Sequence, residues 1–127
     1  MPRILIVDDD KLLLEWLQGE LSARGHKVVT AAHGGDALTI AQLVHPHLVL
    51  LDGSLPGLDG FQILERLRAE RPSLPVIMLT GRNGKQDVMT GVKLGARDYL
   101  VKPVDIHKLT SRIDRIFALP LAPAAVL

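Results

Sequence analysis

Several short apolar runs in this 127-residue sequence end at a polar side chain that is able to do chemistry. The first run stops at a pair of acids, the third at one acid followed by glycine, the fourth at a hydroxyl and the fifth at an ammonium group. If these groups meet, a carboxylate beside a bound cation, an amine and a hydroxyl is equipped to attack a phosphoryl group. The residues concerned are Asp8, Asp9, Asp52, Thr80 and Lys102.

The elements that must position these residues alternate regularly along the chain. Short apolar runs stand between longer segments whose apolar residues recur every three or four positions, which is typical of helices. The predicted strands are Ile4–Val7, Lys27–Ala31, Leu48–Leu51, Val76–Leu79 and Tyr99–Val101. The predicted helices span about 10–24, about 35–45, the segment between Asp59 and Pro72, about 84–94, and Ile106–Ile116.

This alternation predicts an α/β fold: a five-stranded parallel sheet in the order 2-1-3-4-5, flanked by five helices in the flavodoxin-like, doubly wound arrangement. The run Lys27–Ala31 is more polar than the others and suits an edge strand. Parallel strands all end at the same edge of the sheet, and the order reverses between strands one and three. We therefore expect Asp8, Asp9 and Asp52 to face one another there, with the hydroxyl and the ammonium group alongside.

The overall composition limits domain number, location and partners. The length suits one domain, which we place at residues 1–118, and the Pro/Ala-rich segment 119–127 is interpreted as a flexible tail or the start of an interdomain linker. The 15 basic and 14 acidic side chains are well mixed, so direct nucleic-acid binding by this chain is not expected. The lack of cysteine fits a cytoplasmic protein, and no apolar stretch approaches the roughly 20 residues of a membrane span.

A cluster of three carboxylates needs a positive partner, because like charges at short range oppose one another's ionisation. Oxygen ligands with room for water match Mg²⁺, which is often shared with phosphate groups. Neither thiols nor a histidine cluster support a zinc site. Lys102 supplies a further positive charge, so transfer of a phosphoryl group to Asp52 would give an aspartyl phosphate.

With these residues in view, the chain resembles the receiver domain of the response regulators of two-component signalling systems. The resemblance covers about residues 3–117 and is carried by the segments ILIVDDD, LVLLDGSLPGLDG, VIMLTG and GARDYLVKP. Their site residues occur in the right order and at places consistent with the fold, which is more specific than any single motif. The resemblance implies a phosphorylation-activated signalling switch and not a turnover enzyme.

The resemblance also implies how the acids divide their work. Asp52 would be the phosphoacceptor. Asp9 and Asp52 would bind Mg²⁺ directly, together with the backbone carbonyl of Ser54, and Asp8 would act partly through water.

The remaining site residues would handle the phosphoryl group and the response to it. Lys102 and Gly81 would bind the phosphoryl group, the small Gly81 would leave access to it, and Thr80 would swing in to hydrogen-bond it. Tyr99 matches a switch aromatic that turns inward when Thr80 moves. The bond between Lys102 and Pro103 would be cis.

The partners that the resemblance implies are a histidine kinase or histidine phosphotransfer protein as donor, and an output domain or effector protein as target. The surface of the fourth helix, fifth strand and fifth helix would carry the signal and is the place of a possible phosphorylation-dependent homodimer. Asp98 and Arg112 fit one salt bridge of such dimers, whereas Val88 and Lys108 are unable to form the second.

Two alternatives stay open from the residues alone. One is a small-molecule phosphohydrolase that passes through an aspartyl phosphate; such enzymes usually carry a second acid two residues past the nucleophile, where this chain has Ser54. The other is an unphosphorylated, receiver-like binding module, which the complete set of acidic and basic site residues disfavours. One departure from the family pattern stands next to the acceptor, where Gly53 replaces a bulky apolar residue. Ser54 and Arg82 occupy positions that vary in the family and that influence how long the phosphate lasts.

Overall fold

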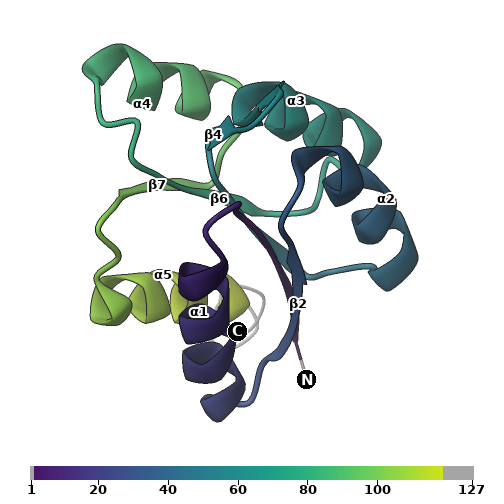
Figure 1. The fold of residues 1–127 in the computed structure, drawn as a ribbon, viewed down its shortest axis with the longest axis vertical. Helices are drawn as coiled ribbons and strands as arrows, with labels where there is room; N and C mark the ends of the chain where they lie inside the picture. Colours follow the sequence, from purple (N-terminus) through teal and green to yellow (C-terminus); the bar gives the residue numbers. More distant parts are fainter. Residues whose placement is uncertain (1, 119–127) are drawn as a thin grey trace, which may run out of the picture.

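The structure is a computed structural model that describes residues 2–118, so the tail expected at 119–127 lies outside the described residues. Helices and strands alternate along the chain as the sequence predicts (Figure 1). The strands are β1 (Arg3–Val7), β2 (Lys27–Ala31), β3 (Leu48–Leu51), β4 (Ser54–Leu55), β5 (Leu58–Asp59), β6 (Val76–Thr80) and β7 (Asp98–Val101). The helices are α1 (Lys11–Ala23), α2 (Gly34–Val44), α3 (Gly60–Glu70), α4 (Lys85–Lys93) and α5 (Ile106–Ala118).

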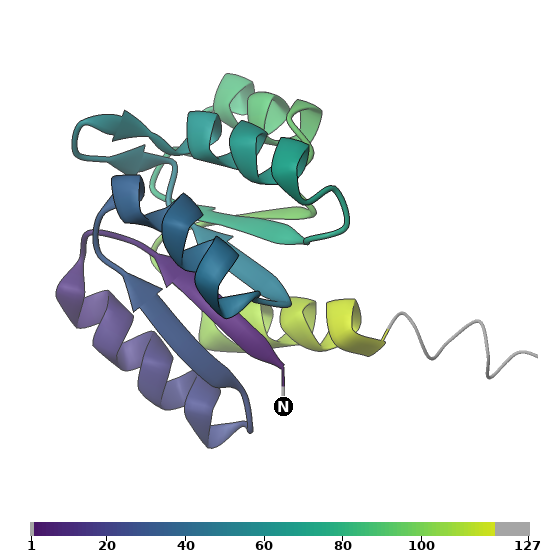
Figure 2. The same cartoon turned by 90° about the vertical axis from the view of Figure 1, so that its right-hand side faces the viewer.

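The main sheet has five parallel strands in the order β2-β1-β3-β6-β7, which confirms the predicted topology. The chain order reverses between β1 and β3, and β2 lies at an edge, as its more polar sequence indicated. Figure 2 shows the layers: α1 and α5 cover one face of the sheet, and α2, α3 and α4 lie on the other.

Two aliphatic clusters fill the space between these layers, because neighbouring residues of a strand point to opposite faces. In β1, Leu5 and Val7 belong to the cluster under α2 and α3, whereas Ile4 and Ile6 belong to the cluster under α1 and α5. All four are almost completely buried. A strand buried on both faces must be apolar throughout, which is why these runs show no polar alternation.

Helix ends follow the capping residues in the sequence. The side chain of Asp10 accepts a hydrogen bond from the amide of Leu13 (3.1 Å) at the start of α1, and Asp59 accepts one from Phe61 (2.9 Å) at the start of α3. Gly25, just past α1, has a φ of +90°, a conformation that a residue with a side chain rarely adopts. The Asp10 cap places the first turn of α1 directly after the acids that follow β1, whereas α3 begins at Gly60, after the segment 53–59 that follows Asp52.

A small antiparallel hairpin, β4–β5, is the element that the sequence analysis did not predict. It contains four paired residues around Pro56 and Gly57, and Gly57 has a φ of +72°. Proline followed by a positive-φ glycine is typical of a type II turn, so the Pro–Gly pair was a usable signal. Among the described residues, no helix is both long and apolar enough to cross a membrane.

Candidate functional site

The acids are held by the ends of β1 and β3, which pair with each other at the centre of the sheet. Asp52 follows β3 directly, and its amide donates to the carbonyl of Val7 (3.0 Å), so its backbone continues the pairing of these strands. Asp8 follows β1 in the same way and donates from its amide to Ala31 on β2 (3.1 Å). The sheet therefore fixes both acids at the point where the strand order reverses, as expected.

Carboxylate oxygens of Asp8, Asp9 and Asp52 lie within 4.8 Å of one another. Asp8 is 2% exposed and Asp52 is 5% exposed, whereas Asp9 is open to solvent. Three oxygen donors at this separation, without nitrogen or sulfur, suit a hard divalent cation that keeps water ligands on its open side. The chemistry of the donor set thus fits a metal site.

Lys102 is the cation that the structure places against the two buried acids. Its Nζ lies 2.7 Å from Asp8 and 3.1 Å from Asp52. Burial works to lower the pKa of the Lys102 ammonium, but the hydrogen bonds and charges of both carboxylates outweigh burial and raise that pKa. Burial raises the pKa of Asp8, and the hydrogen bond from Lys102 acts in the opposite direction.

Backbone amides two residues further along orient the same two acids. Asp52 accepts a hydrogen bond from the amide of Ser54 (3.0 Å), and Asp8 accepts one from the amide of Asp10 (2.9 Å). In both cases the carboxylate closes a short turn after its strand. Each acid therefore has one oxygen held by a backbone amide and the other paired with Lys102.

The end of β6 and the start of α3 border the loop that carries the acceptor. Thr80, the last residue of β6, is completely buried, and its Oγ1 accepts a hydrogen bond from the amide of Arg82 (3.2 Å). Gly81 is exposed, and a Cβ built on it would meet nothing within 4 Å. Gly60, by contrast, packs against backbone, since a Cβ there would lie 2.0 Å from the carbonyl oxygen of Asp52.

Tyr99 on β7 lies between this loop and α4. Its hydroxyl donates a hydrogen bond to the carbonyl of Arg82, and its ring leaves space only for glycine at position 91 of α4, where a Cβ would lie 2.9 Å from a ring carbon. Burial raises the pKa of the Tyr99 phenol. The tyrosine therefore connects the segment after Thr80 to the packing of α4.

Two further sequence expectations have a defined place in the structure. The peptide bond between Lys102 and Pro103 is cis. Asp98 and Arg112, which fit an intermolecular salt bridge by resemblance, form an ion pair within this chain.

The structural importance of Arg82 was missed in the sequence analysis. Its guanidinium group contacts residues of the loop after Asp52 and of α4, and these partners are separated from it by up to 29 positions. No local pattern reports contacts at such separations. The only signal was a long cationic side chain close to the strand-end Thr80.

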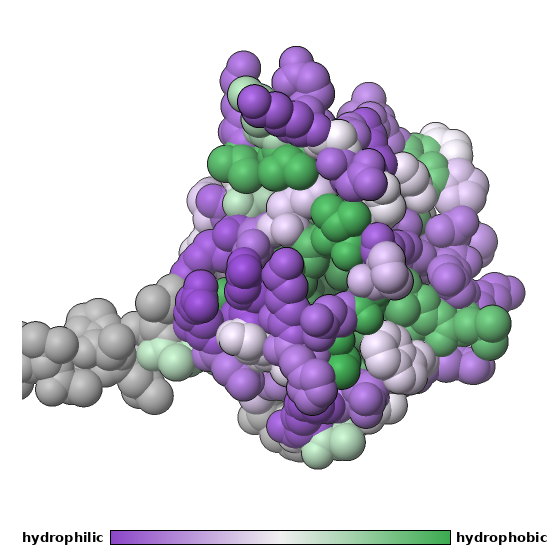
Figure 3. All heavy atoms as spheres, turned by 90° about the vertical axis from the view of Figure 1, so that its left-hand side faces the viewer, coloured by the Kyte–Doolittle hydropathy of each residue, from purple (hydrophilic) through white to green (hydrophobic). Residues whose placement is uncertain are grey.

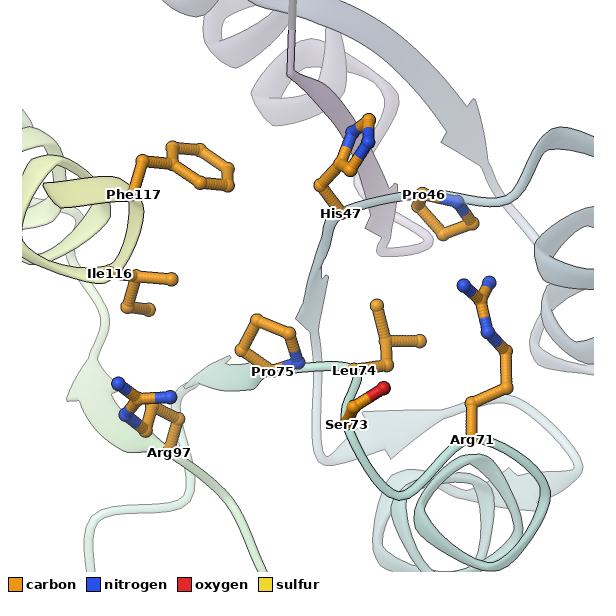
Figure 4. A pocket seen from close by; sticks show the side chains of 9 residues that line it. All are labelled: Pro46, His47, Arg71, Ser73, Leu74, Pro75, Arg97, Ile116 and Phe117. Atoms are coloured by element: carbon orange, nitrogen blue, oxygen red, sulfur yellow. The ribbon is translucent and has the colours of Figure 1, made fainter. Parts of the chain in front are cut away.

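A hollow of about 390 Å³ occurs elsewhere, at the opposite edge of the sheet, where β3, β6 and β7 begin (Figure 4). Figure 4 shows two arginine side chains on different sides of the hollow. Its walls contain none of the predicted site residues; they are formed by Pro46, His47, Arg71, Ser73, Leu74, Pro75, Arg97, Ile116 and Phe117.

Comparison with known proteins shows the family. The model of the response regulator receiver domain matches residues 4–114, nearly the whole described chain. The chain belongs to the response regulator receiver domain family. It is therefore related to regulatory proteins, in agreement with the resemblance of its motifs.

Relatives of this receiver domain differ in length. It is 42% identical over 120 residues to the protein PilH of Pseudomonas aeruginosa, covering 93% of this chain and 99% of PilH. It is 43% identical over 116 residues to the transcriptional regulatory protein AfsQ1 of Streptomyces coelicolor, covering 91% of this chain but 51% of AfsQ1. The chain thus spans about half the length of that relative.

Solved structures have the same fold. A CheY-like response regulator receiver domain protein from Methanospirillum hungatei JF-1 matches with a TM-score of 0.87 at 33% identity, covering 91% of this chain and 92% of that one. A putative response regulator from Chloroflexus aurantiacus matches with a TM-score of 0.85 at 36% identity, covering 93% and 99%. The fold class predicted from the sequence is confirmed by these matches.

Proposed function

We propose that this receiver domain accepts a phosphoryl group on Asp52 from the phosphohistidine of a histidine kinase or histidine phosphotransfer protein. The observation that carries the proposal is the position of the Asp52 carboxylate, which is buried beside two acids and 3.1 Å from the Lys102 ammonium. A carboxylate with one oxygen held by a backbone amide and the other beside an ammonium group is an oriented nucleophile.

We further propose that Mg²⁺ is the cofactor. Asp8, Asp9, Asp52 and the backbone carbonyl of Ser54 would hold it, and it would supply charge neutralisation for the phosphoryl oxygens. Lys102 contributes positive charge from the protein itself. The open side of the cluster at Asp9 leaves room for water ligands.

The proposed response to phosphorylation begins at Thr80. Its hydroxyl would bond to the phosphoryl group, with Gly81 leaving the approach open, and Tyr99 would repack against α4. The affected surface consists of α4, β7 and α5. Figure 3 shows this face, on which green apolar areas interrupt the hydrophilic surface. Met89 and Val92 of α4 and Val101 of β7 are exposed. Such a surface suits an output domain, an effector protein or a second copy of the chain.

Two more parts of the proposal concern the chain as a whole. Residues 1–118 would form the receiver domain, followed by a linker or tail from 119. The protein would act in the cytoplasm as a regulatory switch that assists its own phosphorylation and dephosphorylation, and not as a turnover enzyme.

Incubation with Mg²⁺ and acetyl phosphate tests the proposed function. We expect a labile adduct that increases the mass by one phosphoryl group, and its absence in Asp52→Asn. Asp36→Asn is the matched control, because Asp36 is an exposed acid in the first turn of α2 that is not part of the cluster. A wild-type protein that gains no phosphoryl group from acetyl phosphate or from a kinase contradicts the proposal. Many turnovers of a phosphomonoester would favour the hydrolase instead.

A further inference from the structure

One arginine joins the two loops that flank the phosphorylation site. Arg82 Nη1 donates to the carbonyl of Gly53 (3.0 Å) and to the carboxylate of Asp59 (3.0 Å), while Nε donates to Asp87 (3.1 Å). Gly53 and Asp59 belong to the segment between Asp52 and α3, and Asp87 lies in the first turn of α4. A single guanidinium group therefore connects the phosphoacceptor loop, residues 52–59, to the start of α4.

The contacts use the particular shape of arginine. A planar guanidinium group presents several donors in fixed directions, so it is able to bridge a carbonyl and two carboxylates at once, which a lysine ammonium on a flexible stem does less well. The group also lies 4.3 Å from the centre of the Phe61 ring at the start of α3. The side chain is 31% exposed, so solvent only partly weakens these interactions.

The backbone of the same residue is part of the switch region. The amide of Arg82 donates to Thr80, and its carbonyl accepts the hydroxyl hydrogen bond of Tyr99. Movement of Thr80 or Tyr99 would thus displace the residue whose side chain joins the phosphoacceptor loop to α4.

Gly53 gives this arginine its room. A Cβ built on Gly53 would lie 3.1 Å from Cδ of Arg82 and 3.2 Å from Oγ1 of Thr80, both shorter than ordinary van der Waals contacts. A bulky residue at position 53 would have to displace the arginine stem from its path across the loop. The glycine and the arginine therefore fit each other.

We propose that Arg82 is a positioning residue that couples the phosphoacceptor loop to the start of α4, and that Gly53 permits this coupling. The inference rests on the proposed function and adds the physical connection through which a change at Asp52 reaches α4. It concerns transmission of the signal and not the lifetime of the phosphate. Both Asp59 and Asp87 are required partners, because the connection needs an anchor on each side.

The coupling is tested in the full chain with Mg²⁺ and beryllofluoride, a phosphoryl analogue. Fluorine NMR reports whether the adduct forms. The backbone amide chemical shifts of α4, residues 85–93, report whether adduct formation changes the conformation of that helix. We expect Arg82→Gln to form the adduct but to shift the α4 equilibrium about five-fold less than the wild type, the low end of allosteric coupling. Arg82→Lys should reduce the α4 shift similarly, since lysine keeps the positive charge but lacks the planar guanidinium group with its several donors.

Arg24→Gln is the matched control, because Arg24 forms a solvent-exposed ion pair with Glu20 on α1. It should respond as the wild type does. An Arg82→Gln adduct with undiminished α4 shifts overturns the inference. A wild-type protein that forms no adduct contradicts the proposed function instead, and the inference then depends on a ligand-free measurement.

That measurement is amide hydrogen exchange without Mg²⁺ or analogue. The amide of Gly60 bonds to the Gly53 carbonyl, and the amide of Val88 bonds to the Gly84 carbonyl, so they report on the loop and on α4 respectively. Arg82→Gln should accelerate exchange at both positions, and adding Gly53→Ala should have little further effect. Acceleration at one position alone, or fully additive effects, would disprove the coupling.

Discussion

Replacing Lys102 by methionine tests the electrostatics of the whole site. Methionine keeps most of the length of the side chain but removes the ammonium group that lies 2.7 Å from Asp8 and 3.1 Å from Asp52. Both acids stay 5% exposed or less, so solvent is unable to replace the lost charge fully. The variant therefore leaves two buried carboxylates facing each other.

The size of the effect follows from the spacing of the carboxylates. Oxygens of the cluster lie within 4.8 Å of one another, and two unit charges at that upper limit repel by about 3.5 kcal/mol at an effective dielectric constant of about 20, and by about 0.9 kcal/mol in water. Removing one partner of a buried ion pair costs about 3–5 kcal/mol, and the partial exposure of Lys102 reduces that figure. We expect Lys102→Met to lower the free energy of unfolding by about 2–4 kcal/mol near neutral pH without Mg²⁺.

Asp52→Asn should behave in the opposite way, although it alters the same ion-pair cluster. Asparagine still accepts the hydrogen bond from the Ser54 amide, Lys102 keeps Asp8 as its partner, and one repulsive charge is gone. We expect its free energy of unfolding to equal that of the wild type or to exceed it by up to about 1 kcal/mol. In the double variant, Asp52→Asn should restore about 1–3 kcal/mol of the loss caused by Lys102→Met.

Urea unfolding followed by circular dichroism, in EDTA at neutral pH, measures these differences. Lys27→Met is the matched control, because Lys27 is exposed at the start of β2. Addition of Mg²⁺ at about 100 times its dissociation constant should then stabilise the wild type by about 2.7 kcal/mol. The reasoning is refuted if Lys102→Met is as stable as the control, or if Asp52→Asn restores nothing in the double variant.

Three other predictions concern packing, pH and the switch. Gly60→Ala should lower the free energy of unfolding by about 3 kcal/mol or more in urea titrations, since its Cβ would lie 2.0 Å from a backbone oxygen. Gly19→Ala is the control within α1: its Cβ would meet nothing within 4 Å, so the substitution should raise the free energy of unfolding by about 0.5–1 kcal/mol. Burial lowers the pKa of His26, and its Nδ1 lacks a hydrogen-bond partner among the described residues, so the unfolded chain binds a proton at this histidine more readily than the folded chain does. The free energy of unfolding should therefore fall as pH drops through about 6.5. Thermal unfolding of His26→Gln should show a weaker dependence of stability on pH in that range. Tyr99→Phe removes the hydroxyl bond to Arg82, costs about 1 kcal/mol of stability in urea unfolding, and should reduce the amide shifts of α4 in the beryllofluoride adduct without preventing the adduct.

The fold was predictable because each strand and helix has a local signature. The apolar runs of β1 and β3 are continuous because both faces of these strands are buried. Asp10 and Asp59 cap the starts of α1 and α3, and Gly25 follows the end of α1, as their residue types predict. The hairpin β4–β5 was not predicted, since strands of two residues are too short to show alternation, although the turn at its tip was readable.

The acid cluster was predictable for a topological reason. Once the strands are parallel, residues that follow them must gather at one edge, and no knowledge of side-chain conformation is needed to bring Asp8 and Asp52 together. The contacts of Arg82 are different. They depend on the path of a long side chain across a glycine and on acids 5 and 23 positions away, which no periodic pattern encodes.

The burial of the acids also explains which of their charges are neutralised by the protein and which are left to solvent. Lys102 pairs with Asp8 and Asp52, the two members that solvent scarcely reaches, whereas Asp9 is exposed and stays hydrated. An ammonium group placed against Asp9 would gain little, because water already screens that charge. With all side chains ionised, three carboxylates and one ammonium leave a formal charge of −2, which equals the charge of one divalent cation with opposite sign. The protein thus neutralises the charges that are costly to bury and leaves the accessible side of the cluster to an ion from solution.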